Sequence, residues 1–340
     1  MGVITQDGMQ ALAQAQPNIA LVKYWGKRDA KLNLPAVGSL SITLESLWTR
    51  TRVVIDDTLG ADCLVLDGRT ARPEQSARVS ALLDQIRSRT GAYEHARVET
   101  TNNFPTGAGL ASSASGFAAL ALAASRAFGL SLAQSELSLI ARQASGSAAR
   151  SIFGGFVEMK RGSAADGRDA CALPLLGPEV WPLEVVIAIT STGEKDIGSS
   201  EGMTRSQSSP YYESWVRTSE SDLAAARAAV AARDFEALAA VSEHSCLKMH
   251  ALAMSAEPGL VYWNGATVEA LQRVRALRRE GVAVFFTIDA GPQVKAICRP
   301  ADAQRVAEAL RDVPGVGRVL RSALGGDARL LEPAALQATA

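Results

Sequence analysis

The sequence predicts an α+β protein built as two halves. The chain has 340 residues, which is more than a single hydrophobic core usually holds. Strand and helical patterns both occur in its first part, and a stretch with three prolines, residues 173–182, separates them from a second set of strands and helices. We therefore expect one half in residues 1–182 and the other in residues 183–340.

The first half is expected to begin with an irregular N-terminal segment. Short runs of β-branched or alternating residues then predict strands over 18–25, 39–48, 50–55, 63–66, 96–101 and 151–159. Apolar residues that recur every three or four positions predict helices over 74–89, 111–128 and 131–144. Ser131 is the expected cap of the last helix, and Gly154-Gly155 is expected to bend the last strand.

The second half opens with a continuous apolar run, residues 183–190, which is typical of a buried strand. Further strands are predicted over 282–288, 294–298 and 316–320. Helical patterns cover 213–231, 234–254, 266–280 and 301–313. This order predicts an antiparallel sheet with its own helices, and the tail after Pro333 is expected to be frayed.

Composition excludes several classes of protein. The 35 basic and 35 acidic residues give a formal net charge of zero, which offers no general attraction to nucleic acid or to an anionic membrane. No apolar run approaches the ~20 residues of a membrane span, and no secretory signal is evident, so we expect a cytoplasmic protein. The four cysteines are scattered without a C-x-x-C pair, and His95, His244 and His250 lack metal-ligand spacing, so these residues are interpreted as structural.

A glycine-serine run at the start of a predicted helix is the most informative motif. It reads Asn102-Asn103-Phe104-Pro105-Thr106-Gly107-Ala108-Gly109-Leu110-Ala111-Ser112-Ser113-Ala114-Ser115. Its glycines can adopt positive φ, and its serines offer hydroxyl groups where a helix presents unpaired N–H groups and a partial positive charge. The run therefore indicates a phosphate site that is not a Walker A loop. An ordinary helix cap is the alternative that this segment alone leaves open.

Two further segments have the residue types of a reactive site. Residues 17–28 place Lys23, Lys27 and Arg28 beside aromatic residues at the end of an apolar strand. Residues 286–292 place Asp289 at the corner between a strand and an Ala-Gly-Pro turn. From the residues alone, Asp289 could equally be a turn-forming aspartate, and Lys27 and Arg28 could be solvated charges.

These segments together resemble the GHMP small-molecule kinase superfamily and, within it, the diphosphomevalonate decarboxylase family. The resemblance extends in order from about residue 17 to residue 292, and it includes Ser145-Gly146-Ser147-Ala148-Ala149-Arg150-Ser151, Gly154-Gly155-Phe156-Val157-Glu158, Ser199-Ser200-Glu201-Gly202-Met203 and Asp289-Ala290-Gly291-Pro292. It implies a GHMP kinase fold. Residues 1–182 would form a ribosomal protein S5 domain 2-like half that binds ATP, and residues 183–340 a ferredoxin-like α/β half that completes the substrate cleft.

One segment departs from the family pattern. The family usually has Asn-Ser-Ser or a similar triplet before the Leu-Ser of the second strand, whereas this chain has Val37-Gly38-Ser39-Leu40-Ser41. Nucleotide contacts from that strand are therefore left open.

The resemblance implies an ATP-dependent decarboxylation of mevalonate 5-diphosphate to isopentenyl diphosphate. In that reaction Asp289 would orient or deprotonate the tertiary 3-hydroxyl group, and Lys23 would lie beside it. Arg150 would hold the C1 carboxylate, because its planar guanidinium group matches a carboxylate bidentately.

The resemblance also implies the binding residues. The substrate would be bound by Tyr24, Lys27, Ser145, Ser147, Arg150 and Ser199. Tyr24 and Trp25, as neighbours on a strand, should point to opposite faces. ATP would be bound by Asn102, Pro105, Gly107, Ala108, Gly109, Leu110, Ser112 and Ser113. Ser112 would reach Mg²⁺, which needs few protein ligands because it keeps its waters. Members of the family are commonly homodimers.

Two alternatives remain at this level. One is a kinase or decarboxylase of the same fold that acts on mevalonate or mevalonate 5-phosphate. The other is a nucleotide-binding regulatory protein without turnover, which the presence of Asp289 disfavours.

Overall fold

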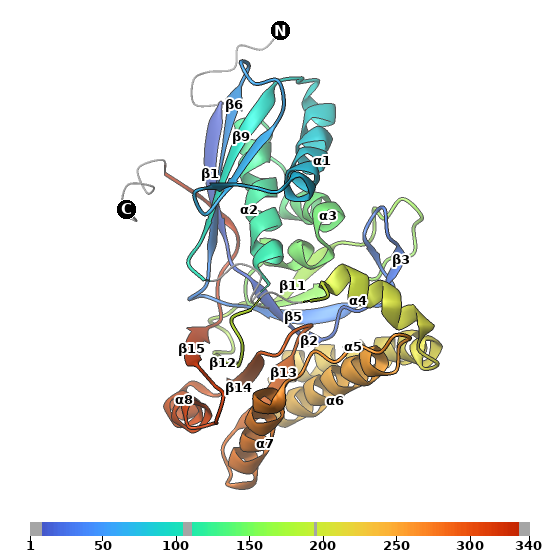
Figure 1. The fold of residues 1–340 in the computed structure, drawn as a ribbon, viewed down its shortest axis with the longest axis vertical. Coiled ribbons are helices and arrows are strands. Elements are labelled where there is room, and N and C mark those ends of the chain that lie inside the picture. The colour runs from blue at the N-terminus through green and yellow to red at the C-terminus, as the bar shows by residue number, and fades with distance from the viewer. Residues whose placement is uncertain (1–8, 105–110, 194–195, 333–340) are drawn as a thin grey trace.

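The computed structural model describes residues 9–104, 111–193 and 196–332. It is elongated, with α1, α2 and α3 in one end of the molecule and α5 to α8 in the other (Figure 1). Two antiparallel β-sheets, one from each half, meet between these ends and position the candidate site.

The first sheet has the strand order β16-β1-β6-β9-β7-β8. Its strands are β1 (Gln10–Ala15), β6 (Thr49–Asp56), β7 (Cys63–Leu66), β8 (Arg69–Thr70), β9 (His95–Asn102) and β16 (Arg329–Leu331). Among these neighbours only β7 and β9 are parallel. Three helices lie on one face of this sheet: α1 (Pro73–Thr90), α2 (Ser112–Ala127) and α3 (Gln134–Ala144).

The second sheet lies in the middle of the molecule and has the strand order β11-β10-β5-β2. Its strands are β2 (Asn18–Val22), β5 (Ser39–Thr43), β10 (Phe156–Met159) and β11 (Ala172–Leu176). A small hairpin of β3 (Lys27–Asp29) and β4 (Leu34–Pro35) follows β2, and the 3₁₀ helix η2 (Gly146–Ile152) precedes β10. All pairings in this sheet are antiparallel.

The third sheet has the strand order β13-β14-β12-β15 and is antiparallel, as the sequence predicts. Its strands are β12 (Glu184–Ile189), β13 (Val284–Ile288), β14 (Val294–Cys298) and β15 (Arg318–Ala323). The helices of this half are α4 (Ser199–Arg205), α5 (Tyr212–Ala232), α6 (Phe235–Met254), α7 (Gly265–Arg279) and α8 (Ala303–Arg311), with short 3₁₀ turns η3 (Ser206–Ser208) and η4 (Pro300–Asp302). Helix α6 packs against both α5 and β13.

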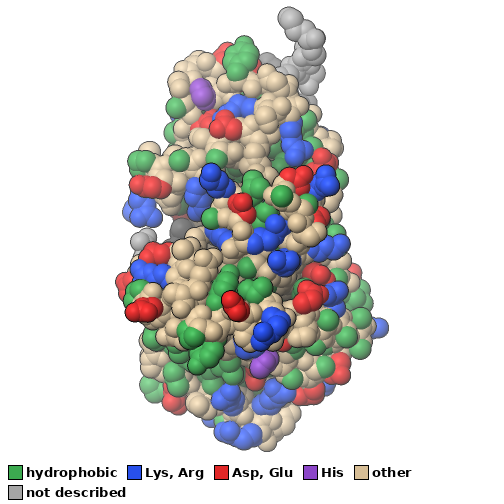
Figure 2. Space-filling view, turned by 90° about the vertical axis from the view of Figure 1, so that its right-hand side faces the viewer, with side chains coloured by type: hydrophobic (Ala, Val, Ile, Leu, Met, Phe, Trp, Pro, Cys, Tyr) green, Lys and Arg blue, Asp and Glu red, His purple; other side chains and the backbone are tan. Residues whose placement is uncertain are grey.

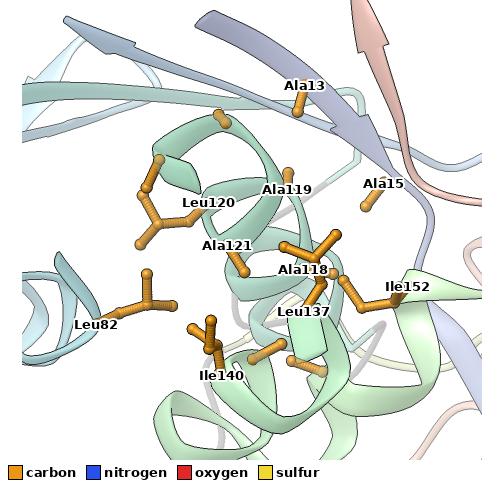
Figure 3. Packing of buried hydrophobic residues seen from close by; sticks show 14 of the residues in the cluster. Ala13, Ala15, Leu82, Ala118, Ala119, Leu120, Ala121, Leu137, Ile140 and Ile152 are labelled. Carbon is orange, nitrogen blue, oxygen red and sulfur yellow. The ribbon is translucent and has the colours of Figure 1, made fainter. Parts of the chain in front are cut away.

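Small side chains bring helix α2 close to the first sheet. Figure 3 shows Ala118 and Ala119 of α2 beside Ala13 and Ala15 of β1, with Leu82 of α1 and residues of α3 completing the cluster. These four alanines are fully buried. Because alanine has only a methyl group, the backbones of helix and strand approach each other closely, and the start of α2 is held firmly on the sheet.

The same packing explains why one sequence expectation is wrong. Residues 10–15 are not irregular but form β1 between β16 and β6. Strands are predicted from β-branched residues, which residues 10–15 lack. The closeness of α2 requires alanine at positions 13 and 15 instead.

Other expected boundaries need correction. The linker expected over 173–182 contains β11, which pairs with β10, and its Pro174 is tolerated because β11 is the edge strand. The strand expected from residue 151 begins only at Phe156, after η2. Helix α3 begins at Gln134, where the Glu136 carboxylate accepts a hydrogen bond from the Ala133 N–H group at 3.1 Å, so Ser131 is not its cap. The strands expected over 63–66 and 294–298 are confirmed as β7 and β14.

A large hydrophobic cluster joins the two halves. It contains Ile19 and Leu21 of β2, Leu40 of β5, and residues of β12 and β13 such as Ile187 and Phe285. The second and third sheets therefore share one core, so the end of β2 and the end of β13 are fixed relative to each other.

The surface carries mixed charge. On the face shown in Figure 2, basic and acidic side chains are interspersed rather than gathered by sign. Of the helices in the described segments, none has the length and apolarity needed to cross a bilayer.

Candidate active site

Two strand ends from opposite halves bring a lysine and an aspartate together. Lys23 follows β2, Asp289 follows β13, and Lys23 Nζ lies 2.6 Å from Asp289 Oδ1. The same Nζ donates a hydrogen bond to the Ala20 carbonyl oxygen at 2.8 Å, and Thr287 Oγ1 donates to that oxygen at 3.2 Å. The proximity that the resemblance implies for Lys23 and Asp289 is therefore present.

A second lysine, which the sequence analysis missed, completes this cluster. Lys295 Nζ lies 3.3 Å from Asp289 Oδ2, and the Lys295 side chain is fully buried in β14. A signal for it was available, because Val-Lys-Ala-Ile-Cys places one charge inside an apolar strand, and a buried lysine almost always has a partner. We call Lys23, Asp289 and Lys295 the catalytic cluster.

The charges of the catalytic cluster determine its protonation. Burial alone would raise the pKa of Asp289, but the charges and hydrogen bonds of Lys23 and Lys295 outweigh burial and hold that pKa below its usual range. Burial lowers the pKa of Lys295, and the charge of Asp289 offsets part of that change. Asp289 is therefore an ionised carboxylate at neutral pH, and 27% of its side chain remains exposed to a ligand.

Arg150 forms a second buried cationic site. It lies in η2 with 2% of its surface exposed. Its Nε and Nη2 donate to Asn18 Oδ1 at 3.1 and 3.0 Å, Nε also donates to Ser41 Oγ at 3.0 Å, and Nη1 donates to Ser39 Oγ at 2.7 Å. Burial lowers the pKa of Arg150 to about 10, an effect partly offset by Tyr24 and Asp289, so the guanidinium group stays charged at neutral pH.

The partners of Arg150 are all neutral. No carboxylate of a described residue forms an ion pair with it. Ser39 and Ser41 belong to β5, the strand whose nucleotide contacts the sequence left open, and in this structure they orient Arg150 instead. Within the described residues, this buried guanidinium group is therefore held by neutral hydrogen-bond partners alone.

Tyr24 and Trp25 lie after β2 rather than within it, so the argument from strand alternation does not apply to them. Trp25 is a core residue, whose indole N–H donates to Ser206 Oγ at 2.8 Å. The Tyr24 hydroxyl group is buried without a hydrogen-bond partner among the described residues, close to Gly146, and burial raises its pKa to about 12. In this structure the hydroxyl group is enclosed by protein atoms.

The other predicted substrate residues lie on three separate segments. Lys27 of β3 donates from Nζ to Ser200 Oγ of α4 at 3.2 Å, which links the two halves. Ser199 is the first residue of α4 and is half-buried. Ser145 and Ser147 flank Gly146, with their hydroxyl oxygens 3.5 Å apart.

The predicted nucleotide residues lie partly within the described segments. Pro105, Gly107, Ala108, Gly109 and Leu110 lie outside the described residues. Ser112 and Ser113 are the first residues of α2, half-buried and exposed respectively. Asn102 Oδ1 accepts a hydrogen bond from Thr49 Oγ1 at 2.6 Å, and Thr49 Oγ1 lies 2.6 Å from Ser115 Oγ, so Asn102 is tied to the first turn of α2.

A cavity that the sequence did not predict opens beside these residues. Its volume is about 130 Å³, and its lining comes from β7, α1, β9 and α2. The lining residues are Leu64, Leu66, Gln75, Arg78, Val79, Thr100, Asn102, Ser112, Ser113, Gly116, Phe117 and Leu120. The walls are mostly apolar, with a few polar groups next to the start of α2, which is the character of a site for a flat heterocycle attached to a phosphate chain.

Within residues 9–104, 111–193 and 196–332, no three His, Cys, Asp or Glu side chains gather closely enough to form a metal site. Ser112, the predicted magnesium ligand, is the first residue of α2.

Comparison with known proteins identifies relatives along most of the chain. Residues 15–172 match the diphosphomevalonate decarboxylase-like N-terminal domain, and residues 185–326 match the mevalonate 5-diphosphate decarboxylase C-terminal domain. A diphosphomevalonate decarboxylase from Ganoderma lucidum is 36% identical over 306 residues, which cover 83% of this chain and 76% of the relative.

Solved structures give the same result. Mevalonate diphosphate decarboxylase from Staphylococcus aureus is 34% identical with a TM-score of 0.90, covering 95% of this chain and 98% of that one. A complex described as MDDEF with MVAPP, AMPPCP and magnesium is 35% identical with a TM-score of 0.88, covering 95% of this chain and 99% of that one.

Proposed function

Since the chain belongs to the diphosphomevalonate decarboxylase family, it converts mevalonate 5-diphosphate and ATP to isopentenyl diphosphate, ADP, phosphate and CO₂, and we propose that the catalytic cluster performs the phosphoryl transfer. The observation that carries this proposal is the contact of Asp289 with Lys23 and Lys295 at the junction of the two halves.

Asp289 accepts a hydrogen bond from the 3-hydroxyl group of the substrate and orients it toward the γ-phosphate. Its lowered pKa makes it a weak base, so it takes the proton late, as the O–P bond forms. This suits a loose phosphoryl-transfer transition state, in which the attacking oxygen needs orientation more than early deprotonation. Lys23 and Lys295 offset negative charge in a site where water is largely excluded.

Arg150 binds the C1 carboxylate of the substrate. Its hydrogen bonds to Asn18, Ser39 and Ser41 hold the guanidinium plane in one orientation. Loss of phosphate from C3 and of CO₂ from the adjacent carbon requires the breaking bonds to be aligned, and a fixed guanidinium group supplies that alignment.

The diphosphate is bound by Lys27, Ser145, Ser147 and Ser199, which offer one ammonium group and three hydroxyl groups. Tyr24 supports this site from behind Gly146, and its ring lies 5.8 Å from the Arg150 guanidinium carbon.

ATP is the co-substrate and Mg²⁺ the metal, in line with the AMPPCP and magnesium of the relative's complex. Asn102, Ser112, Ser113 and the segment 105–110 bind the phosphates. When bound, the ion neutralises charge on the β- and γ-phosphates. The cavity between α1, β7, β9 and α2 receives the adenine ring, because it lies beside the start of α2 and has apolar walls.

The adenine assignment has a direct test. Gly116 lines the cavity, and a Cβ at this position meets no atom within 4 Å. Gly116→Leu should fill the cavity and raise the KM for ATP ~10-fold while the KM for mevalonate 5-diphosphate stays the same. Gly116→Ala is the matched control and should retain both constants. Equal ATP kinetics in the Leu variant and the wild type would exclude this cavity as the adenine site.

We further propose that residues 1–182 and 183–340 are the two domains, and that the protein is a cytoplasmic homodimer. The four cysteines, all described and all free, are consistent with a reducing compartment. Sedimentation analysis of the purified chain tests the dimer, and fractionation of the source cells tests the compartment.

The reaction is tested by supplying the purified protein with ATP, Mg²⁺ and mevalonate 5-diphosphate. Equal amounts of CO₂, ADP and phosphate should appear. ADP without CO₂ would indicate a kinase of the same fold, and a preference for mevalonate 5-phosphate would change the substrate. The absence of ATP consumption with any mevalonate derivative would leave only a regulatory nucleotide-binding role.

A further inference from the structure

Strand β13, which leads to Asp289, lies at the edge of its sheet. On the side away from β14, no strand of the described segments neighbours it, so its backbone groups there need other partners. Helix α6 runs along this side (Figure 1).

Three α6 side chains bind the free backbone groups of β13. Glu243 Oε1 accepts a hydrogen bond from Phe286 N at 3.2 Å. Cys246 Sγ accepts from Ile288 N at 3.2 Å and donates to Ile288 O at 3.5 Å, and His250 Nε2 lies 3.2 Å from the same Ile288 O. Positions 243, 246 and 250 share one helix face, and 286 and 288 share one strand edge, so the two elements are in register.

The protonation of His250 follows from this contact. The imidazole is 1% exposed and packs against Trp263, with ring centroids 4.7 Å apart. Because a carbonyl oxygen can only accept, Nε2 carries the hydrogen and Nδ1 carries a lone pair. Burial, together with the charge of Lys23, lowers the pKa of His250 to about 3, so the ring is neutral and this tautomer persists at neutral pH.

Packing alone does not explain a histidine at this position. Its Nδ1 is buried and has no hydrogen-bond partner in the described part of the chain. An unsatisfied buried polar atom is destabilising, and a phenylalanine would fill the same space without one. The gain that offsets this cost is the Nε2–H donor to Ile288.

We propose that His250 is a positioning residue for Asp289. Ile288 directly precedes Asp289, so a hydrogen bond to the Ile288 carbonyl oxygen fixes the peptide plane from which the Asp289 side chain projects. The same helix also fixes the partner lysine, because Ser245 Oγ accepts a hydrogen bond from Lys23 N at 3.0 Å. Helix α6 thereby sets the distance between the two ends of the catalytic cluster. This inference rests on the proposed role of Asp289.

The test compares substitutions that retain or remove the donor. His250→Phe keeps the ring but lacks Nε2–H, and it should lower kcat roughly 10- to 100-fold, as expected when a reacting group is displaced by a fraction of an ångström to 1 Å. The KM for ATP and for mevalonate 5-diphosphate should change less than ~3-fold, since neither binding surface is altered. His250→Gln places an amide N–H near the position of Nε2 and should restore most of kcat.

Controls separate positioning from folding. His244→Phe, at an exposed position of the same helix, should leave kcat and the melting temperature unchanged. If His250→Phe does not fold, His250→Gln is compared with His250→Asn, whose shorter amide does not reach Ile288. Higher kcat for Gln than for Asn supports the proposal, and equal kcat overturns it.

These experiments separate the role of His250 from the reaction itself. An active wild type whose His250→Phe variant keeps its kcat overturns this inference alone. Equal loss in Phe and Gln variants, with raised KM values, assigns His250 to packing and also overturns it. A wild type that releases no CO₂ overturns the proposed reaction and this inference with it.

Discussion

Two buried cations of the active site, Lys23 and Arg150, are neutralised in different ways. Lys23 is 1% exposed and contacts the Asp289 carboxylate at 2.6 Å. Arg150 is 2% exposed, and its hydrogen bonds go to neutral oxygens of Asn18, Ser39 and Ser41. A buried charge is costly without a counter-ion. The charge of Lys23 is therefore neutralised within the protein, whereas on the proposed function an anion of the substrate would neutralise the charge of Arg150.

The largest loss of activity is expected when the contact between Asp289 and its two lysines is broken. Asp289→Asn is nearly isosteric but leaves Lys23 and Lys295 without a counter-charge. We expect kcat to fall roughly 10³-fold or more, equivalent to about 4 kcal/mol in activation free energy. Stopped assays of CO₂ release give the rate, and calorimetry with a non-hydrolysable ATP analogue should show that the nucleotide still binds. A variant that keeps most of its rate would show that Asp289 is not essential.

Substitution of Arg150 should cause the next largest loss of activity. Arg150→Lys keeps a positive charge but loses the planar fork that contacts three partners at once. We expect kcat/KM for mevalonate 5-diphosphate to fall ~10²-fold, about 2.7 kcal/mol. The KM for ATP serves as an internal control and should hardly change. Near-normal kcat/KM would assign the substrate carboxylate to another residue.

Removal of one cation from the catalytic cluster should be visible in the pH profile. Lys23 and Lys295 hold the pKa of Asp289 below its usual range, so the wild type should keep Asp289 ionised down to pH values below about 4. Lys295→Met removes one of these charges and raises that pKa, which should shift the acidic limb of kcat/KM upward by about one pH unit or more. An acidic limb at the same pH in both proteins would mean that Asp289 does not control it.

The smallest effect is expected at Tyr24. Its hydroxyl group is buried without a partner in the described residues, so Tyr24→Phe removes an unsatisfied polar atom. We expect the free energy of unfolding to rise by about 1 kcal/mol and the KM for mevalonate 5-diphosphate to change less than ~3-fold. Denaturant titration and steady-state kinetics measure the two quantities. A large rise in KM would show that the Gly146 segment moves and exposes the hydroxyl group to the diphosphate.

The sequence predicted those site residues that lie in recognisable local motifs. Lys23 and Asp289 each follow a short apolar strand, with Gly26 and Gly291 a few positions further along the chain. Their proximity across 266 positions was predicted from the family resemblance. Lys295 was overlooked because a single lysine within an apolar strand has no motif around it. The cavity beside α2 could not be predicted, since its lining comes from four elements whose arrangement only the folded chain defines.

The fold was predictable where periodicity is strong and less so where packing overrides it. The long helices α5, α6 and α7 lie where their apolar spacing indicates. Strand β1 was missed because α2 selects alanine there, and β11 was missed because its proline is compatible only with an edge strand. In both cases a tertiary contact, which the local sequence does not reveal, determined that the segment forms a strand.

The hydrophobic cluster shared by the second and third sheets has a consequence for how the polypeptide acquires its structure. Residues of β2 and β5 bury their apolar faces against residues of β12 and β13, so each part supplies an interior surface to the other. Expressed alone, either part would leave that surface in water and tend to aggregate. The boundary near residue 182 therefore divides the sequence into two parts that do not fold independently. Thermal denaturation of the whole protein should proceed as one cooperative transition.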